Sequence, residues 1–154
     1  MKEPTKFQPQ DPAYQNRIQN SFAAQGLMLH LGAKLTSLGP GEAEIRVPFR
    51  LELTQQHQFF HAGVTGAIGD TACGYAAYTL MPADSSVLTV EYKMNLLATA
   101  DGEELIARAR VVRAGKTLTV CLADVLVRKV GAEKHCATML ATIMCMAGRT
   151  DGPR

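Results

Sequence analysis

A stretch of small residues around one carboxylate constrains this chain more than any other feature. It spans residues 61–77, HAGVTGAIGDTACGYAA. Wound as a helix, it surrounds Asp70 with small side chains, at Gly63, Gly66, Ala67, Cys73, Gly74 and Ala77. The opposite stripe is apolar and is expected to lie on a sheet: Val64, Ile68, Ala72 and Tyr75. Each interior glycine disfavours the helix by roughly 1 kcal/mol, so we expect a close approach beside Asp70 that offsets this cost.

Composition narrows the class of protein. A chain of 154 residues is one domain by size and buries roughly 68–70% of its unfolded surface. A net charge of +2 with 19% charged residues argues against a nucleic-acid partner. The four cysteines form no CxxC pair and are expected to be reduced and buried: Cys73, Cys121, Cys136 and Cys145. Without an apolar leader or a membrane-length apolar run, the sequence predicts a cytoplasmic protein with no membrane partner.

The chain ends and the first helix are predicted from local signals. Residues 1–10 and 149–154 are expected to be flexible, which leaves a single domain over 11–148. Asp11 as N-cap, Pro12 as first helical residue and Gly26 past the end predict a helix over about 12–25.

Alternating apolar and polar residues predict six strands. The first two, residues 27–35 and 42–49, are expected to form a hairpin. Four more follow the long helix, at 88–96, 105–112, 116–129 and 136–146, and the last two are apolar enough to be covered on both faces. The sequence therefore predicts an α+β fold in which an antiparallel sheet wraps around one long central helix.

Three segments together carry a resemblance to a known family. They are His61-Ala62-Gly63-Val64, Asp70-Thr71-Ala72 and LTVEYKMN at 88–95. The chain resembles the hot-dog fold acyl-CoA thioesterases of the phenylacetate-pathway (PaaI-like) type. That family carries His-Gly-Gly at the helix start and a carboxylate nine residues after the histidine, a spacing that this sequence matches. The likeness runs from about residue 11 to 146 and includes 102–120.

The resemblance implies hydrolysis of an acyl-CoA thioester without a cofactor. Asp70 matches the family's carboxylate, which acts as a general base on water or as a nucleophile. The backbone N–H of Ala62 matches the group that polarises the thioester carbonyl. Gln55 stands where the family often has an asparagine that places water or substrate. Thr89 matches a position whose hydroxyl helps to place the attacking water.

Four further residues are candidate substrate contacts, each with a structural alternative. His61 and Gly63 lie at the start of the helix, where His61 is better explained as a structural residue than as a proton-transfer group. Arg113 and Lys116 match the region where family members hold the nucleotide of coenzyme A, although arginines on an exposed strand are commonly a solvated face. His57 and His61 lack a third ligand at suitable spacing, so no metal site is predicted.

The resemblance also implies a homodimer, or a dimer of dimers, with the active site shared between subunits. Tyr75, Phe59 and Phe60 leave room for either an aromatic or a medium-length aliphatic acyl group. A hot-dog hydratase is disfavoured because no acidic residue lies between Glu52 and Asp70. A non-catalytic acyl-CoA-binding hot-dog protein remains the alternative, since Gln55 and Ala62 both depart from the common pattern.

Overall fold

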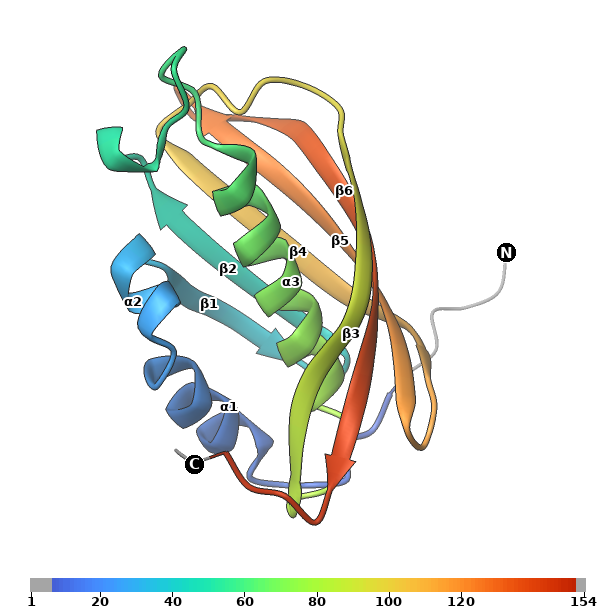
Figure 1. Ribbon diagram of the computed structural model, residues 1–154. Coiled ribbons are helices and arrows are strands. Elements are labelled where there is room, and N and C mark those ends of the chain that lie inside the picture. The colour runs from blue at the N-terminus through green and yellow to red at the C-terminus, as the bar shows by residue number, and fades with distance from the viewer. Residues whose placement is uncertain (1–6, 152–154) are drawn as a thin grey trace.

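A six-stranded antiparallel sheet curves around one long helix, α3 (Ala62–Tyr78), in the computed structural model, which describes residues 7–151 (Figure 1). The strand order is β1-β2-β4-β5-β6-β3. The strands are β1 (Lys34–Gly39), β2 (Glu42–Pro48), β3 (Ser85–Leu96), β4 (Glu104–Ala114), β5 (Leu118–Lys129) and β6 (Ala132–Ala147). The predicted fold class is confirmed, with β1 and β3 as the two edges of the sheet.

The long helix buries its apolar stripe as the sequence predicts, at Val64, Ile68, Ala72 and Tyr75. Tyr75 does not lie on the sheet as expected, because its ring packs on Phe22 and its hydroxyl contacts Ser21 and Gln25. Gly69 allows the close contact with the sheet, because a Cβ there would lie 3.1 Å from the terminal methyl of Met139. On the other side Asp70, Ala67 and Gly74 are half-buried and face outward. The helix therefore fills the core while it presents one carboxylate to solvent.

The prediction for the N-terminal third was partly wrong. Residues 26–31 form a second helix, α2 (Gly26–Leu31), and the strand begins only at Lys34. The leucines that alternate along 27–35 imitate a strand, but Met28 and Leu31 are buried while Leu27 and Leu29 are exposed. That spacing of three is helical. Gly32 ends the helix with φ of +68° in the left-handed region.

The first helix, α1 (Tyr14–Ala23), is shorter than predicted. Asp11 caps the preceding turn, because its carboxylate accepts the N–H of Ala13 at 2.8 Å, while Ala13 itself occupies the N-cap. Gly26 begins α2 and does not terminate α1. Between β2 and α3 the chain forms a short 3-10 turn, η1 (Leu51–Leu53), where the sequence shows no periodicity.

One expectation about exposure needs correction. Strand β5 is central, but α3 covers only one of its faces, and its outward side chains are half-exposed. In the N-terminal segment, Phe7 packs on Gly41, and Gln10 donates to the carbonyl of Leu80 at 2.8 Å. Residues 1–6 and 152–154 lie outside the described part of the chain.

Cys73, Cys121 and Cys136 are buried free thiols, as expected, whereas Cys145 is half-exposed. Burial raises the pKa of Cys121 to about 12 and that of Cys136 to about 11, so both thiols stay protonated at neutral pH. These side chains pack as small apolar groups.

A single arginine ties α1 to the end of α3. The Arg17 guanidinium donates to the carbonyls of Pro82 at 2.6 Å, Met81 at 3.0 Å and Tyr78 at 3.3 Å. Its Nε lies 3.0 Å from the Asp11 carboxylate, an ion pair that is not a well-aligned hydrogen bond. Its planar group also lies 4.2 Å from the centre of the Tyr78 ring. The contact satisfies carbonyls at and after the C-terminal end of α3, where the helix dipole favours a positive charge.

We expect Arg17→Met to lower the free energy of unfolding by about 2–4 kcal/mol, because the change leaves Asp11 and the carbonyls without their donor in a largely buried site. Urea denaturation monitored by circular dichroism measures the loss. Arg17→Lys is the matched control: it keeps the charge, lacks the planar fork of donors and should lose an intermediate amount. A loss below about 0.5 kcal/mol in Arg17→Met would contradict this role for the arginine.

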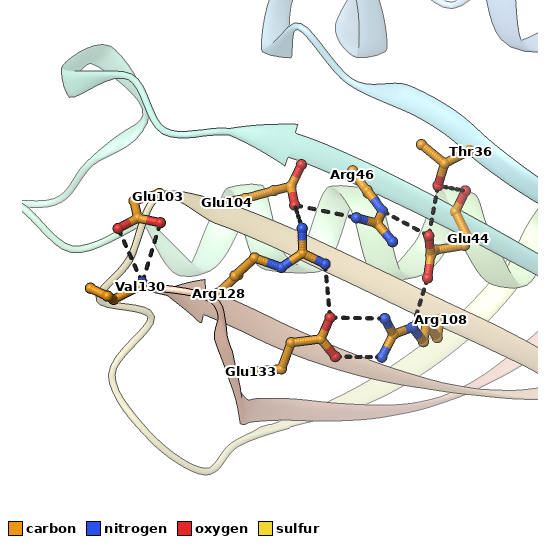
Figure 2. Close-up of polar contacts among 9 residues, drawn as sticks. All are labelled: Thr36, Glu44, Arg46, Glu103, Glu104, Arg108, Arg128, Val130 and Glu133. Carbon is orange, nitrogen blue, oxygen red and sulfur yellow. Dashed lines mark hydrogen bonds and ion pairs between the residues drawn. The ribbon is translucent and has the colours of Figure 1, made fainter.

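The outer face of the sheet, turned away from α3, carries a network of six charged side chains (Figure 2). It consists of Glu44, Arg46, Glu104, Arg108, Arg128 and Glu133. Hydrogen bonds from Arg108 and Arg128 lower the pKa of Glu133 to about 2. Partial burial raises the pKa of Glu44, but hydrogen bonds from Arg46, Arg108 and Thr36 outweigh it and bring the value to about 2. Glu44 and Glu133 therefore stay ionised at neutral and mildly acidic pH.

Candidate active site

The predicted catalytic carboxylate and the predicted hydroxyl lie in direct contact. Asp70 projects from the middle of α3 toward edge strand β3, and the Thr89 hydroxyl donates to its Oδ1 at 2.7 Å. A β-bulge between Thr89 and Glu91 interrupts the predicted alternation of β3, so Thr89 faces α3 on the same side as Tyr92. Thr89 is exposed in a single chain. The fold thus brings together two candidates that are 19 residues apart.

The environment of Asp70 makes its carboxylate a stronger base than a free aspartate. Burial raises the pKa of Asp70 above its ordinary value of 3.8, and the Thr89 hydrogen bond partly opposes the rise because it stabilises the charged form. Among the described residues Asp70 forms no ion pair, so no cation holds the carboxylate away from a substrate. A partly desolvated carboxylate of this kind can accept a proton from water or attack a carbonyl carbon.

A hollow of about 340 Å³ opens beside Asp70, between α3, α2 and β3. Small and apolar groups from α3 and β3 line much of it, including Ala67, Gly74 and Val87. Gln25 and Tyr75 also reach this hollow. The sequence predicts Tyr75 as a neighbour of the acyl group, whereas it does not predict Gln25. Their contact joins positions 50 residues apart, and no local pattern in the sequence signals it.

The start of α3 leaves one backbone donor free. His61 is the N-cap, and its Nδ1 accepts the N–H of Gly63 at 2.8 Å. Both residues are candidate substrate contacts, and here they cap the helix. The His61 carbonyl accepts the N–H groups of Val64 and Thr65. Within residues 7–151 the Ala62 N–H has no acceptor. This donor lies at the positive end of the helix dipole and can polarise a carbonyl oxygen there.

Gln55 lies near this free donor. It lines a second hollow of about 360 Å³ together with Ala62, Phe59 and Phe60. The side-chain oxygen of Gln55, Oε1, accepts the backbone N–H of His57, and this bond holds the Gln55 side chain within its loop. The amide NH₂ of Gln55 stays available as a donor. His61 and Gly63 line a third hollow, of about 340 Å³, on the α2 side.

The two halves of the predicted site lie apart within one chain. Ala62 and Asp70 are eight residues apart on one straight helix, which corresponds to about 12 Å along its axis. A side chain tilts toward the helix N-terminus and recovers only part of this distance. A reacting carbonyl must lie about 3 Å from both its base or nucleophile and its oxyanion donor. One chain by itself therefore does not place Asp70 and Ala62 around the same thioester.

Arg113 and Lys116 lie at the end of the β4–β5 hairpin, and both are exposed. Thr119 pairs with Ile143, which pairs with Thr89, so the base of this hairpin is level with Thr89 and about 10 Å from it across the sheet. Neither cation forms an ion pair with another described residue. By contrast, Arg108 belongs to the ion-pair network of the outer face.

Across residues 7–151 no three histidine, cysteine or acidic side chains are grouped so that they could hold a metal ion. In the same range, none of the helices combines the length and the apolar character needed to cross a membrane.

Comparisons with known proteins identify the family and the fold. Residues 57–132 match a family model described as Thioesterase superfamily. A proposed esterase of Halobacterium salinarum is 32% identical over 108 residues, covering 67% of this chain and 71% of the relative. A second proposed esterase, from Saccharolobus solfataricus, is 29% identical over 97 residues, or 63% of this chain and 69% of that protein.

Solved structures extend the likeness over most of the chain. A thioesterase family protein from Silicibacter pomeroyi is 46% identical with a TM-score of 0.86, covering 88% of this chain and 99% of that one. The Escherichia coli PaaI protein from the phenylacetic acid degradation operon has a TM-score of 0.79 over 89% of this chain and 95% of its own. Its identity of 19% supports the shared fold alone. The hot-dog architecture is therefore confirmed.

Proposed function

Because this chain belongs to the thioesterase superfamily, we propose that it is an acyl-CoA thioesterase of the PaaI-like type, with Asp70 as its catalytic carboxylate. The observation that carries the proposal is the pairing of this half-buried carboxylate with the Thr89 hydroxyl beside an open hollow. Such a carboxylate can activate water, or attack the thioester carbon itself, and release a free acid and coenzyme A. An aromatic or a medium-length aliphatic acyl group fits the hollow's size.

The Ala62 N–H serves as the oxyanion donor in this proposal. It is a backbone group without a partner at a helix N-terminus, so it is oriented before the substrate arrives. Gln55 lines the same hollow, and its amide NH₂ can assist as a second donor to the carbonyl or to the attacking water. Arg113 and Lys116 supply positive charge for the phosphates of coenzyme A.

We further propose that two chains share each site. The free edge of β3 exposes Leu88, Val90 and Tyr92 at 56%, 51% and 47%, which is unusual for a long edge strand in a monomer. When two β3 edges pair antiparallel about a two-fold axis, the two α3 helices run in opposite directions. The Ala62 end of one helix then approaches Asp70 of the other, which removes the separation of about 12 Å found within one chain. A dimer built in this way has two sites.

Subunit mixing tests the shared site. We expect Asp70→Ala and Ala62→Pro proteins, each impaired alone, to recover about a quarter of wild-type activity after random exchange, because half of the dimers are mixed and each has one intact site. Exchange is followed by mass spectrometry of the native dimers, and the oligomeric state by sedimentation. Absence of recovery despite exchange, or full activity in a monomeric chain, would exclude the shared site.

Release of free thiol from a panel of aromatic and aliphatic acyl-CoAs tests the function as a whole. We expect steady production of coenzyme A by the wild type and almost none by Asp70→Asn. Tight binding of acyl-CoA without thiol release from any member of the panel would instead support the non-catalytic acyl-CoA-binding protein. The same panel ranks the acyl groups.

The pH profile tests the state of Asp70. The carboxylate acts in its charged form, so kcat/KM should fall as pH drops through a pKa that lies above 3.8. Thr89→Val removes the hydrogen bond that favours the charged form, and its acid limb should therefore move to higher pH. Thr89→Ser keeps the hydroxyl and serves as the control. An acid limb that stays in place in Thr89→Val would contradict the contact's effect on Asp70.

A further inference from the structure

Two side chains that line the hollow beside Asp70, Gln25 and Tyr75, are hydrogen-bonded to each other, and Tyr75 also bonds to Ser21. The Tyr75 hydroxyl donates to Ser21 Oγ at 3.1 Å, and Gln25 Nε2 donates to the Tyr75 hydroxyl at 2.8 Å. These residues come from α1, from the N-cap of α2 and from α3. We call this group the Gln25–Tyr75–Ser21 partition.

A larger cavity, of about 800 Å³, lies on the other side of the partition. Gln25 lines both spaces, while Ser21 lines the larger one and Tyr75 the smaller. Ala24, Tyr78 and Ala83 contribute apolar surface to the larger cavity. The partition therefore separates the space at Asp70 from a second space more than twice its volume.

The distance from Asp70 to the partition matches a short acyl group. Tyr75 follows Asp70 by five residues, which is about 7.5 Å along the helix axis. Between them Gly74 leaves open space, because a Cβ added there would meet no atom within 4 Å. An acyl group with its thioester carbon at Asp70 can thus lie along α3 and meet the partition after roughly the length of one aromatic ring.

The partition is held rigidly. Tyr75 is 2% exposed. Its ring packs edge-on against Phe22, with ring centres 6.0 Å apart, and stacks on Tyr78, with ring centres 6.4 Å apart. Gln25 is fixed at one end by the backbone of the α2 N-cap and at the other by its bond to Tyr75. A chain that pushed past Gln25 would separate these polar atoms without offering them new partners.

We propose that the Gln25–Tyr75–Ser21 partition limits the length of the acyl group, with Gln25 as the specificity-determining residue. This inference rests on the proposed function, because it needs the thioester carbon at Asp70. The partition stops the acyl chain because its side chains fill the space and because their hydrogen bonds to one another would have to break. Removing the Gln25 side chain joins the two spaces and admits longer acyl groups.

A ladder of straight-chain acyl-CoAs from butanoyl to hexadecanoyl tests the proposal. We expect wild-type kcat/KM to rise by up to about fourfold for each buried methylene and then to fall beyond a cut-off length. In Gln25→Ala the cut-off should move by at least about two carbons, the part of the glutamine stem that is lost. The first chain rejected by the wild type should gain at least about tenfold in kcat/KM from those two methylenes.

Two further variants keep the test sharp. Asn20→Ala removes the same kind of amide from the larger cavity without touching the partition, and its length profile should equal that of the wild type. Tyr75→Phe keeps the ring but releases Gln25 and Ser21, so the cut-off should shift in the same direction by less. If Gln25→Ala does not give a native circular dichroism spectrum, Tyr75→Phe decides the question.

The outcomes separate this inference from the proposed function. An unchanged cut-off in folded Gln25→Ala and Tyr75→Phe proteins, or a wild type without a cut-off, overturns the partition while thioester hydrolysis stands. A wild-type protein that releases no thiol from any acyl-CoA overturns the proposed function and the partition with it.

Discussion

Replacing Asp70 by asparagine is expected to lower kcat for thioester hydrolysis by at least about 100-fold. Asparagine has the shape of aspartate, and its carbonyl oxygen can still accept the Thr89 hydroxyl. It can neither take a proton from water nor act as a nucleophile at neutral pH. Steady-state kinetics on an acyl-CoA measure the loss, and KM should change little because the volume beside the substrate is preserved.

The control for Asp70→Asn is its stability toward urea, which shows whether the fold is intact. Asp70 makes no ion pair within the described residues, so the variant should unfold at the same urea concentration as the wild type or at a higher one. Turnover within about tenfold of the wild type in such a folded protein would end the assignment of Asp70 as catalytic.

Ala62→Pro is expected to lower kcat by about 100- to 1,000-fold, the range seen when one oxyanion donor is removed. Proline deletes the N–H and changes little else, because Ala62 is the first residue of α3, where proline is favoured. His61 before it already has φ of −64° and ψ of 140°, a conformation that suits the residue preceding a proline. The free N–H is the donor that disappears.

Ala62→Gly completes the pair of variants at this position. It retains the backbone N–H, so kcat should stay within about threefold of the wild type. Thermal unfolding of both proteins checks that α3 is intact. If Ala62→Gly lost as much activity as Ala62→Pro, the methyl group would matter and the oxyanion role of the N–H would be wrong.

The sequence was sufficient for the centre of the fold and misleading at one edge of it. The long helix could be predicted because its apolar residues recur at helical spacing, and the burial of Val64, Ile68 and Ala72 agrees with this. The side of small residues is less open than expected, since Cys73 and Ala77 are buried too. Residues 27–35 could not be assigned correctly from local pattern, since alternate leucines satisfy a strand while burial of Met28 and Leu31 selects a helix. Packing against the core, which no short window contains, decides between the two.

The site divides in the same way. Asp70 and Thr89 could be proposed from the resemblance, and the structure places them 2.7 Å apart. The side of β3 on which Thr89 lies could not be predicted, because a bulge between Thr89 and Glu91 shifts the alternation. Gln25 could not be proposed, because its link to Tyr75 joins two helices 50 residues apart and depends on how α1 and α2 cross α3. Contacts between elements far apart in the chain produce no repeating pattern in the sequence, so they cannot be predicted from it.

The charged network on the outer face has a consequence for behaviour in acid. The folded-state pKa values of Glu44 and Glu133 are about 2, below the value of 4.5 for a free glutamate, so their stabilisation is complete above pH 4.5 and is lost progressively as pH falls toward 2. Asp70 has the opposite shift and takes up its proton earlier. Activity therefore disappears while the sheet still holds its ion pairs, and returning the protein to neutral pH should restore turnover fully and without delay.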